Sequence, residues 1–211
     1  MKKYLLAAAA SMVFAMPANA ALVDFNSAPG GAVSEGTDIG GIIFTSALGS
    51  GLSIGSFAES NNSPALAAFN DGNGNFILGA IASGANHLSL EFGNDDPGFT
   101  NPGDLATLQL FSGAILLDTV TVLLNRDDMM NQTISYSGAA FDNFSFAYTD
   151  AAGNPFTGGG GAAVGLIEVI DNINFAAVPE PATWAFMIFG FGAIGGAMRR
   201  QRKANVKVSY A

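Results

Sequence analysis

The residues of this chain that could do chemistry are mainly carboxylates. Asp171 lies in the run Ile170-Asp171-Asn172-Ile173-Asn174-Phe175, where strict alternation places it on the same strand face as Ile173 and Phe175. A carboxylate on a buried face needs a partner, because its transfer out of water is costly. Structural Ca²⁺ is one candidate partner, with Asp24 as a co-ligand. The alternative is a β-bulge that turns Asp171 to solvent, or a simple capping role for its carboxylate.

Two other acid-rich segments are weaker metal candidates. The run Asp71-Gly72-Asn73-Gly74-Asn75 begins like an EF-hand loop, but Phe76 stands where that loop needs Gly and Ala82 where it needs Glu. We therefore interpret it as a turn. The segment 94–98, together with Asp104, could hold an exposed Ca²⁺, but a solvated loop is the favoured interpretation.

One short motif suggests a nucleophilic serine. Gly51-Leu52-Ser53-Ile54-Gly55 matches the G-x-S-x-G pattern of α/β-hydrolases, whose strained strand-to-helix turn exposes the serine oxygen. The surrounding chain lacks the alternating helices of that fold, and His87 is the only histidine available as a base. We therefore predict no catalytic residues and no enzymatic activity. A hydrolase with paired carboxylates is the least favoured alternative, since the separation of carboxylates is not visible in a sequence.

Three runs alternate with the two-residue period of half-buried strands. Their apolar members are Leu88, Leu90 and Phe92; Val120, Val122 and Leu124; and Phe144, Phe146 and Tyr148. Turn-rich clusters separate the runs, at 27–31, 70–75, 94–103, 125–128 and 158–161. Many short strands predict an all-β fold, a single β-sandwich ectodomain of jelly-roll type.

Both ends of the chain differ from this middle part. Lys2 and Lys3 precede an apolar run, and Ala18 and Ala20 are the small residues that a signal peptidase recognises, so residues 1–20 are predicted to be a signal peptide. The uncharged stretch 182–198 is long enough for a short transmembrane helix. Basic residues follow it and predict a cytoplasmic tail at 199–211. The ectodomain is then 21–177, and a C-terminal segment occupies 178–203.

Charge is divided sharply between these parts. The exported part contains one arginine, Arg126, against sixteen acidic residues, a net charge of −15 with His87 neutral. Nucleic acids and anionic membrane surfaces need a cationic face, so neither is an expected partner of the ectodomain. The chain has no cysteine, so disulfides cannot stabilise the ectodomain after export.

The C-terminal segment resembles the PEP-CTERM sorting signal of Gram-negative bacteria, in the variant with Trp-Ala after Pro-Glu-Pro. The matching run is Pro179-Glu180-Pro181-Ala182-Thr183-Trp184-Ala185, and Arg199 and Arg200 end the uncharged stretch. The resemblance implies handling by an exosortase, a membrane transpeptidase. It also implies export through the inner membrane, a membrane-anchored precursor, and a final place at the cell surface or in the extracellular matrix.

A second resemblance concerns the ectodomain. The segments 23–31, 40–44 and 170–175 are similar to the first two strands and the last strand of jelly-roll ectodomains found ahead of such tails. Together the resemblances imply a non-enzymatic surface or matrix protein associated with exopolysaccharide. A carbohydrate-binding or adhesive module is the alternative. The exposed aromatics typical of such modules are few, since the only Trp is Trp184 and the ectodomain Tyr are Tyr136 and Tyr148.

Overall fold

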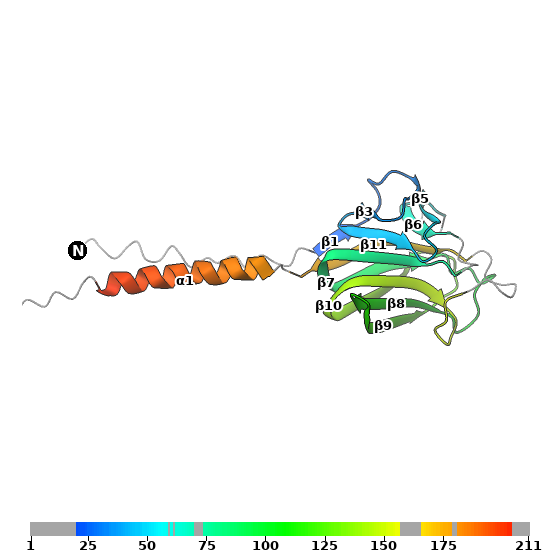
Figure 1. Ribbon diagram of the computed structural model, residues 1–211. Helices are drawn as coiled ribbons and strands as arrows, with labels where there is room; N and C mark the ends of the chain where they lie inside the picture. The colour runs from blue at the N-terminus through cyan, green and yellow to red at the C-terminus, as the bar shows by residue number, and fades with distance from the viewer. Residues whose placement is uncertain are drawn as a thin grey trace, which may run out of the picture. The chain divides into compact units, whose positions relative to one another are not determined.

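The computed structural model describes residues 20–58, 60, 62–69, 74–156, 166–178 and 181–203 (Figure 1). The chain divides into two compact units, one that ends at Ala177 and one that begins at Val178. Among the described residues, the first unit consists of antiparallel strands and the second of one helix, α1 (Pro181–Lys203). The prediction of a mostly β ectodomain is confirmed.

The strands follow the chain in short turns and loops. Their bounds are β1 (Ala20–Val23), β2 (Gly31–Ala32), β3 (Thr37–Ile39), β4 (Ile42–Ser46), β5 (Leu52–Ser56), β6 (Pro64–Ala68), β7 (Ile77–Gly93), β8 (Leu105–Ser112), β9 (Ile115–Leu123), β10 (Gln132–Thr149) and β11 (Glu168–Ala177). The three predicted runs lie in β7, in β9 with its following residue, and in β10.

Two long strands, β7 and β10, hold the sandwich together. They pair with each other from Ile77 to Phe92, with register shifts around Phe141. The start of β7 also pairs with β4, and its end with β11. The end of β10 pairs with β8, which pairs with β9. Because partners change along β7 and β10, both strands bend from one layer of the sandwich into the other.

The first and last strands are neighbours. β1 pairs with β11 in the register Ala21↔Phe175 and Val23↔Ile173, and β11 also pairs with β6. Figure 1 shows β1 and β11 side by side. The first and last strands of the described part therefore close on each other, which places Asp24 and Asp171 in the same region of the fold.

The core between the layers is aromatic. Phe92, Phe146 and Tyr148 are buried, with ring centroids 5.5 to 6.3 Å apart. Such tilted and edge-on contacts are the favoured geometries of aromatic pairs. A second pair joins Phe25 to Phe44 at 5.8 Å. The apolar residues of the three predicted runs are all buried or half-buried, so the predicted inward face is confirmed.

The outer face of β10 departs from the prediction. Alternation placed Ser145 and Ala147 on the solvent side, but both are buried. The cause is the turn after β10, which folds back so that Pro155 forms a bridge with Thr149. Thr149 also exchanges a 2.8 Å hydrogen bond with Thr107 of β8. A covered outer face cannot be inferred from the period of one strand.

Gly79 is required by a close approach of chains rather than by its backbone angles. It lies in β7 directly between Phe44 of β4 and Phe144 of β10. A methyl group at Gly79 would overlap the ring of Phe144. A methyl group added at Gly30, in contrast, would lie 3.6 Å from the carbonyl oxygen of Ile54, which is an ordinary van der Waals distance.

We expect Gly79→Ala to lower the free energy of unfolding of residues 21–178 by about 1–3 kcal/mol, the usual cost of overpacking a core. Gly30→Ala is the matched control and should change it by less than about 0.5 kcal/mol. Urea denaturation of the two variants measures both values. Equal stabilities would contradict the packing described for Gly79.

Candidate functional site

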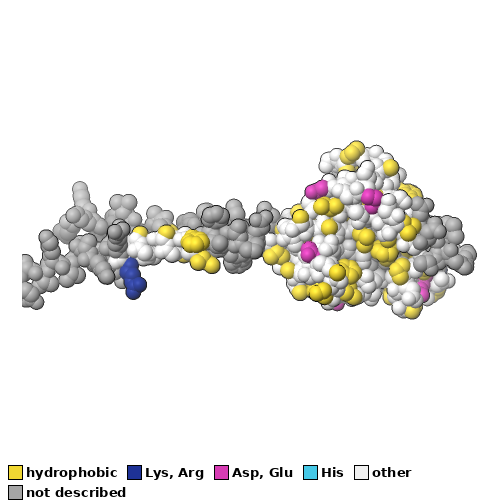
Figure 2. Space-filling model, in the orientation of Figure 1, with side chains coloured by type: hydrophobic (Ala, Val, Ile, Leu, Met, Phe, Trp, Pro, Cys, Tyr) yellow, Lys and Arg dark blue, Asp and Glu magenta, His cyan; other side chains and the backbone are white. Residues whose placement is uncertain are grey.

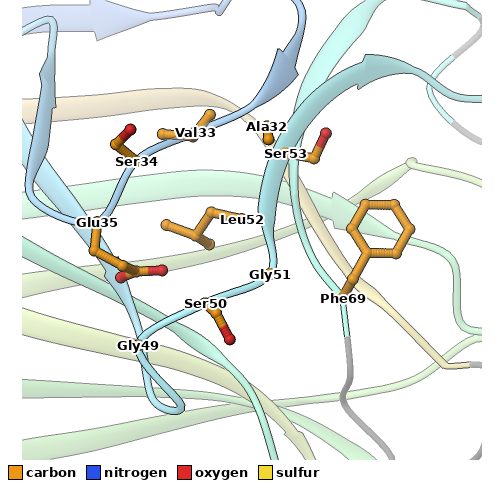
Figure 3. A pocket seen from close by; sticks show the side chains of 10 residues that line it. All are labelled: Ala32, Val33, Ser34, Glu35, Gly49, Ser50, Gly51, Leu52, Ser53 and Phe69. Atoms are coloured by element: carbon orange, nitrogen blue, oxygen red, sulfur yellow. The ribbon is translucent and has the colours of Figure 1, made fainter.

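A groove of about 550 Å³ lies beside β5 (Figure 3). Figure 3 shows Glu35 and Phe69 on opposite sides of Leu52 in this view. The groove is lined by Ala32, Val33, Ser34, Glu35, Gly49, Ser50, Gly51, Leu52, Ser53 and Phe69. Its lining combines hydroxyl groups, one carboxylate and one aromatic ring.

Backbone hydrogen bonds fix the walls of the groove. The N–H of Val33 donates to the carbonyl of Leu52 at 2.9 Å, which continues the pairing of β2 with β5. The N–H of Phe69 donates to the carbonyl of Gly51 at 2.9 Å from the other side. The groove is therefore largely preformed, as ligand sites usually are.

Glu35 is held in one position. Its Oε2 accepts a 2.7 Å hydrogen bond from the N–H of Ser46, and its Oε1 accepts a 2.9 Å bond from the Ser46 hydroxyl. Among the described residues that line the groove, Glu35 is the one acid.

An aromatic pair at the end of the groove was missed by the sequence analysis, which considered only Trp and Tyr. Phe69 packs against Phe57 with ring centroids 6.4 Å apart. Both rings are half-buried and rest on a small apolar cluster of Ala65, Ala67 and Val169, outside the main core. The signal in the sequence is the placement of one Phe just after β5 and one just after β6.

The serine motif has a structure different from that of a hydrolase. Ser53 lies within β5 and not in a strand-to-helix turn. His87 lies within β7, and its Nδ1 is 2.7 Å from the hydroxyl of Ser137. The structure therefore gives Ser53 neither the strained backbone nor the hydrogen-bonded base that nucleophilic catalysis requires.

Asp171 lies on the buried face, as alternation predicts, and is 3% exposed. A bulge is also present, since the pairing with β7 shifts between Asp171 and Asn174 and Asn172 has a φ of 47°. The bulge turns Asn172 to solvent and leaves Asp171 inside. The alternative interpretation, in which the bulge exposes Asp171, is therefore wrong.

The surroundings of Asp171 are acidic. Burial raises its pKa from 3.8 to about 6, and the charges of Glu91 and Asp24 act in the same direction. The backbone N–H of Asn172, 2.7 Å from Oδ1, and the side chain of Ser63 oppose this rise. A buried carboxylate with acidic neighbours favours its protonated form.

The predicted calcium ligands are close enough to interact electrostatically but do not form a complete site. Asp24 is half-buried and accepts a 3.2 Å hydrogen bond from the N–H of Asn26, whose contacts lower the pKa of Asp24. Glu91 accepts a 2.8 Å bond from the side chain of Asn172. Within the described ranges, no group of three or more His, Cys, Asp or Glu residues could hold a metal ion. Calcium at Asp24 and Asp171 remains a prediction.

The acidic loop at 94–98 is solvated only in part, since Pro97 and Gly98 are exposed but Asp95 and Asp104 are buried. Asp95 is 1% exposed, and its carboxylate accepts bonds from the N–H groups of Arg126 and Asp128 at 2.6 and 3.0 Å. Asp104 is 4% exposed and caps a backbone N–H in its own loop. These acids are buried because they organise two neighbouring loops, a role that sequence spacing does not reveal.

The second unit is the helix α1, which begins at Pro181, a favourable first position for proline. Of the residues in the predicted sorting motif, Pro179 and Glu180 lie outside the described residues, and Trp184, Ala185 and Arg200 are described only as helical backbone. Ile188, Phe189 and Phe191 are 71%, 77% and 52% exposed.

The segment 182–198, predicted to be a transmembrane helix, lies within α1 and is helical. A helix both long and apolar enough to cross a membrane is not found in the part of the chain that the structure describes. At the other end, Ala18 of the predicted signal peptidase site lies outside the described residues. Ala20 is the first residue of β1 and pairs with Ala176.

Asp171 gives the ectodomain a specific pH dependence. Its pKa in the folded state lies above the unfolded value, so its ionisation opposes folding. The resulting loss in the free energy of unfolding is absent below about pH 4 and complete above about pH 6. We expect Asp171→Asn to raise the free energy of unfolding at pH 7.5 by roughly 1–2 kcal/mol, after screening by solvent, and to have no effect at pH 4. Chemical denaturation of wild type and variant at both pH values measures this difference.

Asp118→Asn, at an exposed position, is the control and should match wild type at both pH values. The same measurement with added Ca²⁺ tests the metal hypothesis, which requires a stabilisation of wild type that Asp171→Asn loses and Asp96→Asn retains. If Asp171→Asn instead lowers the free energy of unfolding at pH 7.5 without calcium, the Asp171 carboxylate is favourably paired in the folded state.

Two solved structures show weak similarity to the chain. One is the CBM32 of AlyQ in complex with 4,5-unsaturated mannuronic acid, with 14% identity, 53% of this chain and 76% of that chain covered, and a TM-score of 0.30. The other is the CBM22-2 xylan-binding domain from Paenibacillus barcinonensis Xyn10C, with 11% identity, 74% and 98% covered, and a TM-score of 0.39.

The search of curated proteins found no match to this chain. A family model described as the PEP-CTERM protein-sorting motif matches residues 177–203. The match covers the helix α1 and the residues just before it, and it confirms the resemblance drawn from Pro179, Glu180 and Pro181. The chain therefore carries at its C-terminus the PEP-CTERM motif of proteins that are exported and sorted to the cell surface.

Proposed function

We propose that this chain is a non-enzymatic protein of the cell surface or extracellular matrix, delivered there by exosortase processing of its C-terminal segment. The match of residues 177–203 to the PEP-CTERM motif carries the proposal. The two-unit organisation supports it, because the described residues of the main core all precede Val178. Removal of the helix would leave that core complete.

The proposal includes a membrane-held precursor. Ile188, Phe189, Phe191, Ile194 and Met198 are exposed on α1, at positions that a helix of 3.6 residues per turn distributes around its axis. Apolar side chains on several sides of a helix favour an apolar environment. Arg199 follows them and favours the membrane–water boundary.

The charge of the ectodomain restricts the exopolysaccharides that it could contact. A domain of net charge −15 is repelled by acidic polysaccharides unless divalent cations bridge the two. Figure 2 shows the acidic side chains as separate spots on one face of the domain, without a single concentrated patch. We infer that the matrix partner is a neutral polysaccharide, or an acidic one bridged by Ca²⁺.

Carbohydrate binding by the groove is the second candidate function. The groove presents Ser34, Ser50 and Ser53, the fixed carboxylate of Glu35 and the ring of Phe69. Hydroxyl and carboxylate groups beside an aromatic face suit a sugar, which has polar edges and apolar ring faces. This candidate is compatible with a matrix role and differs from it in requiring a defined binding site.

Exosortase processing is tested by the intact mass of the protein from cells with and without the exosortase. We expect loss of the C-terminal segment only in cells that have the enzyme. Glu180→Gln should block the loss because it alters the Pro-Glu-Pro run, whereas Glu91→Gln, in the ectodomain, should not. A mature protein that extends through Ala211 in a cell with the exosortase would contradict the proposal.

The groove is tested by binding of residues 21–178 to a panel of neutral and acidic polysaccharides, with and without Ca²⁺. Ser53→Gln places a larger side chain in the groove and should weaken binding by about tenfold or more, about 1.4 kcal/mol. Ser56→Gln, at the exposed end of the same strand, should leave it unchanged. Binding that survives Ser53→Gln would exclude the groove as the site.

A further inference from the structure

We propose that two copies of the ectodomain associate by antiparallel pairing of their β9 strands. Within the described ranges, β1, β2, β3 and β9 each pair with one strand only. The first three are four residues long or less, and short edges are a common protection against unwanted pairing. β9 is nine residues long and lies at the end of the sheet order, at the lower rim of the ectodomain in Figure 1.

The side chains of β9 give its edge little protection. Ile115, Leu116, Leu117 and Leu123 are 70%, 49%, 37% and 60% exposed, and Asp118 is the only charged residue of the strand. The first half of β10 also pairs only with β7, but it exposes no large apolar side chain. A long, apolar and nearly uncharged edge is a template for another strand.

Hydrogen bonding identifies the residues that face the free edge. The N–H of Leu124 donates to the carbonyl of Asp104 at 3.0 Å and so points to the side of β8. Alternation turns the N–H of Thr119 to the other side, where it donates to the carboxylate of Asp118 at 2.8 Å. Because backbone groups alternate between the two sides of a strand, Thr121 and Leu123 point to the same side as Thr119. A register shift opposite Leu110 and Phe111 places a bulge at Leu117, so the regular part of the edge begins after it.

These constraints select one register. A two-fold axis at Thr121 pairs Thr121 with its copy and Thr119 with Leu123, and it uses every edge-facing residue of the regular part. Asp118 lies off the axis, so the two Asp118 carboxylates are not opposite each other. In this pair the N–H of Thr119 exchanges its bond with Asp118 for one to the other copy.

A second copy is the occupant that this edge fits. An approaching strand must bring apolar side chains to both faces, since Val120 and Val122 are half-buried at the rim of the core while Leu123 is exposed on the other face. A positively charged strand would meet one carboxylate on β9, that of Asp118, which already accepts a hydrogen bond from the N–H of Thr119. β9 itself has the required pattern, and it is present in every copy.

The test is the oligomeric state of residues 21–178, which contain all the core residues that the structure describes. We expect sedimentation to show a concentration-dependent dimer that tightens as salt rises, because two domains of charge −15 repel each other. Thr121→Glu should weaken the dimer by about tenfold or more, since it places two carboxylates at the axis. Thr133→Glu, on the exposed polar edge of β10, is the control and should dimerise as wild type does.

Two further variants test the register. Asp118→Ala frees the N–H of Thr119 and should strengthen the dimer. The chain has no cysteine, so Thr121→Cys alone should form an intermolecular disulfide under oxidation, whereas Thr119→Cys, opposite Leu123, should not. A wild type that stays monomeric at every concentration and salt, or a Thr121→Glu variant that dimerises like wild type, would overturn the proposal.

Discussion

The antiparallel ladder between β7 and β10 is the constraint on which the rest of the ectodomain depends. It runs from Ile77 to Phe92 and takes part in both layers, because β4 and β11 pair with different halves of β7. Its bend at Phe141 brings the two layers face to face over Phe92, Phe146 and Tyr148. Gly79 allows the closest approach within the ladder, since only a residue without a side chain fits beside Phe144.

Local periodicity predicted the strand faces well. The inward residues of β7, β9 and β10 and the burial of Asp171 follow from alternation alone, since side chains point to opposite faces in turn. Alternation did not predict the burial of Ser145, or of Asp95 and Asp104 in the loops, because these depend on segments that are distant along the chain. The groove forms where β2, β5 and Phe69, the residue after β6, come together in the fold. These segments are separate in the sequence, so no single stretch of it predicts the groove.

The distribution of charge connects the two functional proposals. Sixteen acids keep the exported domain strongly negative, which opposes non-specific association and acidic polymers. Among the described residues, the groove beside Phe69 and the edge of β9 have one carboxylate each, Glu35 and Asp118. The basic residues are concentrated after the apolar part of the helix, and an exported domain separated from them would keep only Arg126 as a cation.

The described core of the ectodomain forms without the sorting segment and is held by the β7–β10 ladder. Hydrogen exchange on the full chain and on residues 21–178 tests it directly, since the slowest amides report the most stable elements. We expect the amides of 77–92, 132–137 and 143–146 to exchange slowest, and at the same rates in both proteins. Faster exchange of this ladder after removal of the segment, or slowest exchange elsewhere, would contradict it.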